Sequence, residues 1–192
     1  MNKILLIIAL ISTLLLRAQS VQDIMSVPGP LTFNGTEYFL NWSKQNSKIL
    51  SIQQFLPRDE YLNEFENLLT FNYFNKDIDM EMAVRQKIEN VQNLAKDDKF
   101  ASVNMIESPD GKEFIVEYTL SQSDGSSKPF FEYNIYRFKK IALQEYKTLL
   151  ILSYTKRYYD DFKNAKKINN KEKGSLLTEM VNFVIPEIKV QN

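Results

Sequence analysis

The segment 101–158 constrains the fold most, because it holds four β-prone runs separated by strong turn signals. Ser108-Pro109-Asp110-Gly111 and the sequence S-D-G-S-S at 123–127 are both typical of tight turns between strands. The return run after the first turn alternates, with Phe114, Val116 and Tyr118 on one face. Most of this segment is therefore expected to form an antiparallel sheet, with strands at residues 101–107, 112–121, 130–140 and 149–158.

The rest of the chain combines further strands with helices. Residues 38–44 and 48–56 have the pattern of a strand hairpin, and the apolar spacing of 59–69 indicates a helix. Residues 70–74 fit either a short strand or more of that helix. The clearest helix begins near Asp77, with apolar residues every three or four positions. A solvated helix or loop at 163–173 and a final helix capped by Ser175 complete the expected elements.

The absence of cysteine and histidine excludes several chemistries. There is no thiolate nucleophile, no disulfide, no Ser-His-Asp triad and no His-ligated zinc. No phosphate-binding glycine loop occurs either. Asp77, Asp79 and Glu81 alternate like calcium ligands, but without a glycine for the turn they fit a helix N-terminus better. We therefore assign no catalytic residue, no metal ligand and no cofactor.

The N-terminus predicts export. Lys3, an apolar run at 4–16 and the pattern Ala18-Gln19-Ser20 have the form of a signal peptide at 1–20, cleaved near Ser20 and Val21. No lipobox cysteine follows, so we expect no membrane anchor and a periplasmic or secreted protein. Cleavage leaves 22 basic against 24 acidic residues, which disfavours nucleic-acid binding. A leader at 21–37 and a single α+β domain at 38–192 should follow.

The chain is unusually rich in aromatic side chains, with thirteen Phe, ten Tyr and one Trp. If helices cover both faces of the sheet, these side chains are core. If one face is partly open, they could line an apolar groove for a ligand or a partner. The candidate binding residues on that second interpretation are Trp42, Tyr136, Phe138 and Tyr158.

The order of elements resembles a known fold. Tyr38-x-Leu40-x-Trp42, followed by Phe55-Leu56-Pro57-x-x-Glu60, is similar to the opening of many small exported bacterial proteins. The layout resembles the Mog1/PsbP-like α/β/α sandwich of the DcrB and LpqN type. That resemblance implies an antiparallel β-sheet flanked by helices, and a protein that binds proteins or small ligands.

Two functional hypotheses follow from these observations. The first is an exported non-enzymatic binding protein that acts on a protein partner, including an immunity, inhibitor or envelope accessory role, or on a small apolar ligand. The alternative is a hydrolase that works through carboxylates, which requires two or three Asp or Glu side chains to converge in one pocket. The sequence alone leaves the partner and the oligomeric state open.

Overall fold

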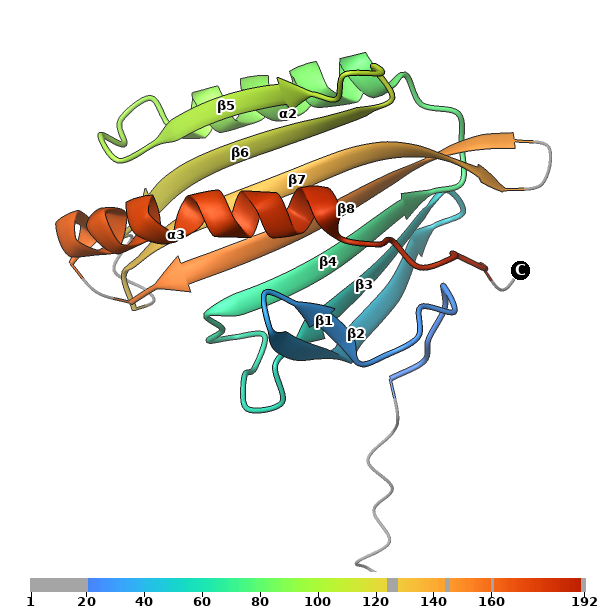
Figure 1. The fold of residues 1–192 in the computed structure, drawn as a ribbon, viewed down its shortest axis with the longest axis horizontal. Coiled ribbons are helices and arrows are strands. Elements are labelled where there is room, and N and C mark those ends of the chain that lie inside the picture. Colours follow the sequence, from blue (N-terminus) through green and yellow to red (C-terminus); the bar gives the residue numbers. More distant parts are fainter. Residues whose placement is uncertain (1–20, 124–127, 144–145, 160, 191–192) are drawn as a thin grey trace, which may run out of the picture.

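The computed structural model describes residues 21–190, apart from 124–127, 144–145 and 160. The predicted signal peptide lies outside the described residues. Within them, eight strands form one sheet on which two helices pack (Figure 1). The strands are β1 (Leu31–Phe33), β2 (Thr36–Ser47), β3 (Leu50–Leu56), β4 (Asn67–Phe74), β5 (Ser102–Glu107), β6 (Glu113–Gln122), β7 (Phe130–Leu143) and β8 (Tyr146–Tyr158), and the helices are α2 (Met80–Leu94) and α3 (Phe162–Asn182).

Two antiparallel meanders make up the sheet and join at its centre. Strands β1 to β4 form the first meander, β5 to β8 form the second, and β4 pairs with β8. Every pairing is antiparallel. The predicted turn at 33–36 is confirmed, with Asn34 and Gly35 at φ values of 48° and 75° that these residues adopt readily. This order leaves β1 and β5 as the two edges of the sheet.

The predicted α/β/α sandwich is wrong. The structure is mostly β, with a single sheet that curls like half of a barrel around α3 (Figure 1). We call the face that packs on α3 the inner face; it carries Phe71, Tyr133 and Leu152. The opposite, outer face packs on α2 through side chains such as Val116 and Phe138. Because α2 covers only the β5–β7 side of that face, most of the outer face has no helical layer among the described residues.

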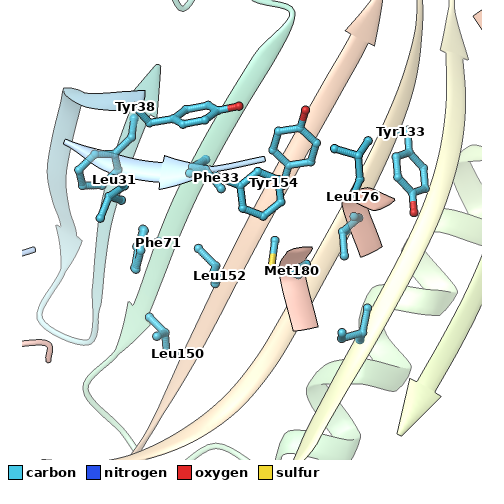
Figure 2. Close-up of a cluster of buried hydrophobic side chains, with 14 of the residues drawn as sticks. Leu31, Phe33, Tyr38, Phe71, Tyr133, Leu150, Leu152, Tyr154, Leu176 and Met180 are labelled. Atoms are coloured by element: carbon cyan, nitrogen blue, oxygen red, sulfur yellow. The ribbon is translucent and has the colours of Figure 1, made fainter. Parts of the chain in front are cut away.

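The main core lies between α3 and the inner face. Figure 2 shows Leu176 and Met180 of α3 directed toward Leu152 and Tyr154 of β8. The rings of Phe33 and Tyr154 stack with centroids 4.6 Å apart. Burial of each such large apolar side chain stabilises the fold by roughly 1.5–3 kcal/mol. The aromatic richness of the sequence is therefore used largely for packing.

The segment predicted as a leader takes part in this core. Met25 and Val27 are buried, and the Lys189 N–H donates to the carbonyl of Met25 at 2.8 Å. The peptide between Gly29 and Pro30 is cis, and β1 follows at once. The leader thus connects the C-terminal tail to the sheet.

The predicted helix over 59–69 is wrong. The Glu60 carboxylate accepts the N–H groups of Glu66 and Asn67 at 2.7 Å each, which holds 57–66 as a loop against the start of β4. Leu68 packs on the outer face beside Phe65, whereas Leu69 lies in the inner core. Adjacent residues on opposite faces are the mark of a strand, so the helical spacing here is a coincidence.

The helix expected from Asp77 is present as α2. Asp79 is its N-cap, and the carboxylate accepts the N–H of Met82 at 2.9 Å. Val84 and Val91 are buried against Phe114 and Val116 of β6. The one-sided apolar pattern thus gives a helix lying on the sheet.

Helix α3 is a single continuous helix, which corrects the prediction of two pieces with a cap at Ser175. The N-cap is Asp161, whose carboxylate accepts the N–H of Lys163 at 3.0 Å, and the Ser175 hydroxyl donates to Glu172 O within the helix. The described residues contain no other helix beside α2 and α3, and neither of these has the length and apolar character of a membrane-spanning segment.

Candidate functional site

The structure brings together only two of the four residues predicted to bind a ligand or partner. Tyr136 and Phe138 lie on the outer face of β7 beneath α2, where Phe138 is buried. Lys87 of α2 places its ammonium 3.8 Å from the centre of the Tyr136 ring. These two residues thus belong to the hydrophobic cluster between α2 and the outer face rather than to an open groove.

Trp42 and Tyr158 lie elsewhere. Trp42 is half-buried on β2 and shares an outer-face row with Tyr136, but strands β3, β4 and β8 separate them. Tyr158 is buried on the inner face, where its hydroxyl donates to Glu172 at 3.0 Å. Burial and the adjacent Glu172 carboxylate raise the pKa of this phenol above its ordinary value. Tyr158 therefore contributes to packing and hydrogen bonding inside the protein and offers no surface to a ligand.

A different feature stands out, namely the edge strand β5, which pairs with β6 alone among the described residues. The other edge, β1, has only three residues and follows Pro30, so it offers little backbone for pairing. By contrast, β5 has six residues in regular register with β6, and it contains no proline, lysine or bulge. Proteins usually protect an exposed edge with a proline, a lysine or a bulge, and β5 has none of the three. Met105 and Ile106 are 45% and 38% exposed along it.

The register shows which main-chain groups of β5 are free. The N–H of Ser108 donates to Glu113 O at 2.9 Å, which makes this a hydrogen-bonded pair at the end of the ladder. Bonded and non-bonded pairs alternate along an antiparallel ladder. Val103, Met105 and Glu107 therefore direct their N–H and C=O groups away from β6. This edge presents three donors and three acceptors to a further strand.

A groove of about 530 Å³ runs between β5 and α2 on the outer face. It is on the same side as the side chains of Val103, Met105 and Glu107, because their partners on β6 face α2. Figure 1 shows α2 running behind β5 along this edge. The floor of the groove is apolar and the rim is polar. The floor consists of Val84, Ile88, Met105 and Phe114, and the rim of Glu81, Arg85, Glu89, Gln92 and Glu107.

The loop that leads into β5 is fixed by one carboxylate. Asp98 Oδ1 accepts the Phe100 N–H and the Ser121 hydroxyl, both at 2.8 Å, and Oδ2 accepts the Ser121 N–H at 2.5 Å. Phe100 in turn packs edge-on against Phe162 of α3. The start of β5 is thus attached to both β6 and α3, so the edge is exposed but held in place.

A second, smaller pocket of about 280 Å³ lies on the inner face between α3 and β5–β7. Its carboxylate is Glu117, which accepts the Tyr133 hydroxyl at 2.6 Å. Burial and this carboxylate raise the pKa of Tyr133 above its ordinary value. Lys166 and Lys173 of α3 complete the pocket. The described residues hold no cluster of three or more acidic side chains suited to a metal ion.

A protein-family model matches residues 25–185 of the chain. The chain belongs to this family. The match runs from the segment before β1 to the end of α3, so it includes β5 and the groove beside it. No curated protein and no solved structure matches the chain. The resemblance to exported proteins of the DcrB and LpqN type therefore stays a prediction.

None of the four site residues predicted from the sequence lies on β5 or lines the groove beside it. The run 101–107 predicts a strand, and β5 confirms it. The position of that strand at the edge of the sheet does not follow from its own residues. One signal is present in the pattern Ser102-Val103-Asn104-Met105, where polar and apolar residues alternate in a short run with few large side chains. The central strand β8 differs, because large side chains such as Leu150, Leu152 and Tyr154 are buried along its inner face.

Proposed function

We propose that the protein is an exported, non-enzymatic binding protein that takes up an extended segment of a protein partner as an additional strand beside β5. The observation that carries this proposal is the unprotected edge of β5, with the free main-chain groups of Val103, Met105 and Glu107. Strand addition to an exposed edge is a common mode of peptide recognition, in which main-chain hydrogen bonds provide affinity.

The groove supports the same proposal. A strand added to β5 places every second side chain on the outer face, beside Met105 and next to the apolar floor formed with Ile88 of α2. Main-chain hydrogen bonds alone do not distinguish one peptide sequence from another. Pockets beside the edge, which accept alternate side chains of the added strand, provide specificity. Here the groove lies on the side toward which the free residues of β5 point their side chains.

The other hypotheses have weaker support. A small apolar ligand could occupy the groove, but it would make no use of the free main-chain groups. For carboxylate hydrolysis, two carboxyl groups must flank one substrate bond. The inner pocket is lined by one carboxylate, Glu117, and the glutamates at the groove rim are exposed. Asp77, Asp79 and Glu81 do line one open hollow of about 720 Å³, but all three are exposed, Asp77 pairs with Lys140, and Asp79 caps α2. The hydrolase hypothesis therefore stays a prediction with weaker support.

A proline at position 105 tests the proposal. Met105→Pro removes the outward N–H and places the ring at the free edge, where proline is tolerated because no bond to β6 is lost. Met105→Val keeps the N–H and an apolar side chain, and serves as the matched control. Each tagged full chain is expressed in its host, and proteins that co-purify from envelope and culture fractions are quantified.

We expect a stoichiometric partner with the wild-type protein and with Met105→Val, and loss of that partner with Met105→Pro. Circular dichroism and the thermal midpoint establish that each variant is folded. Equal recovery of the partner with Met105→Pro overturns the proposal. So does the lack of any stoichiometric partner in both fractions.

A further inference from the structure

The rim of the groove beside β5 carries an excess of negative charge. Glu81 and Glu89 of α2 and Glu107 of β5 contribute three carboxylates, against the single guanidinium of Arg85. All four side chains are exposed. Within the described parts of the chain, none of them takes part in an ion pair.

This lack of pairing contrasts with carboxylates elsewhere in the sheet. On the inner face, Glu113 pairs with Arg137 at 2.6 Å and with Lys139 at 2.5 Å. On the outer face of β7 and β8, Glu132 pairs with Arg157 at 2.9 Å. The carboxylates of the groove thus have no ion-pair partner among the described residues, and they outnumber the cation that lines the groove with them, Arg85.

Three lysines, Lys112, Lys140 and Lys147, lie at the Glu81 end of the groove, and two of them pair with carboxylates outside it. Lys112, which lies close to Phe114, pairs with Asp110 at 3.2 Å. Lys140 pairs with Asp77 just before α2. Lys147 has no ion pair among the described residues and lies near Asp77, in the same hollow as Glu81. Glu89 and Glu107 do not line that hollow, so their negative charge is left in place.

We infer that the segment recognised by β5 is basic, with lysine or arginine at the alternate positions that face α2. This inference rests on the proposed function. Long cationic side chains match both parts of the groove, because their methylene stems can lie on Ile88 and Met105 while their charged ends reach Glu89 and Glu107. A second copy of this chain fits less well, since two acidic rims would then approach each other.

Three labelled peptides test the inference. Each has eight residues, is acetylated and amidated, and alternates threonine with lysine, glutamine or glutamate. Binding to the purified protein is measured by fluorescence anisotropy at low and at high salt. We expect the order lysine, glutamine, glutamate, and a loss of affinity for the lysine peptide as salt rises.

Variants separate the rim from charge in general. Glu89→Gln and Glu107→Gln should each weaken the lysine peptide by about two- to fivefold, as for one exposed ion pair, and leave the glutamine peptide unchanged. Glu37→Gln, an exposed glutamate on β2 without an ion pair among the described residues, is the control and should have no effect. All binding should be lost in Met105→Pro.

The outcomes distinguish the inference from the proposed function. If the glutamine peptide binds as tightly as the lysine peptide and both depend on the N–H of residue 105, strand addition stands and the basic segment is wrong. If the lysine peptide binds equally to Met105→Pro, attraction without strand pairing explains it, and both fail. A failure of the lysine peptide to bind at low salt overturns the inference. A dimer in light scattering that Met105→Pro abolishes identifies a second copy as the occupant and also overturns it.

Discussion

Met105 of β5 lies opposite Val116 of β6 in a non-hydrogen-bonded pair, so both main-chain groups of Met105 point away from the sheet. The side chain of the same residue belongs to the floor of the groove beside α2. One residue therefore offers hydrogen bonds to an incoming strand and apolar contact to its side chains. This combination makes the edge a recognition surface in our account.

The position of β5 should depend on Asp98. We expect Asp98→Ala to lower the free energy of unfolding by about 2 kcal/mol, because three hydrogen bonds to one carboxylate are lost at Phe100 and Ser121. The variant should also weaken binding of the lysine peptide, since the start of β5 is released. Urea unfolding and anisotropy measure the two effects. The neighbouring, exposed Asp97→Ala should change neither, and equal effects of both variants would contradict this role.

Arg137 links the sheet to the end of α3. Its Nη1 donates to the carbonyls of Met180 at 2.9 Å and Phe183 at 2.8 Å, and its Nε pairs with Glu113 at 2.6 Å. We expect Arg137→Ala to destabilise the protein by about 2–3 kcal/mol, because a partly buried carboxylate loses one of its two partners and two helix-end carbonyls lose their donor. Lys139→Ala, at the more exposed partner of Glu113, should cost less than about 1 kcal/mol. Similar losses in urea unfolding would argue against the capping role.

The same ion pair should make stability depend on acidic pH. Burial raises the pKa of Glu113, but hydrogen bonds from Arg137 and Lys139 outweigh it and hold that pKa below the ordinary 4.5. A lowered folded-state pKa adds stability above the unfolded pKa, and this stability is lost as the pH falls through the folded one. The free energy of unfolding should therefore decline below about pH 4.5. Glu113→Gln should show a shallower decline, and parallel curves would contradict the assignment.

Buried tyrosines should control stability at alkaline pH. Burial raises the pKa of Tyr118, Tyr133 and Tyr154 above the ordinary 10.0. A raised folded-state pKa gives stability that is complete below pH 10 and is lost as the pH rises above it. In an ultraviolet titration, we expect these phenols to ionise only when the protein unfolds. Ionisation of all tyrosines at one ordinary pKa, without loss of structure, would show that they are accessible.

Local patterns predicted much of the secondary structure but not its arrangement. The hairpins around Gly35 and Gly111 and the helix after Asp79 follow from turn and cap residues, which act over a few positions. The first half of α3 gives a weak signal, because its buried residues include the small Ala165 and the polar Asn169. These positions are identifiable only once the inner face that contacts them is known.

The candidate site depends on the order of strands, which no local pattern specifies. Trp42 and Tyr136 do share one row of the outer face, yet their strands pair through three others. The exposed edge arises because β4 pairs with β8 and leaves β5 at the far end of the second meander. That pairing joins residues about 80 positions apart, such as Phe71 and Leu152, and is a property of the whole sheet.

Amide hydrogen exchange along β5, followed by NMR, tests the central claim most directly. In the free protein we expect the N–H groups of Val103, Met105 and Glu107 to exchange fast and those of Asn104 and Ile106 slowly, because only the latter bond to β6. Addition of the lysine peptide should protect the first three selectively. Slow exchange of Met105 in the free protein, or unchanged fast exchange when the peptide is bound, would contradict the account.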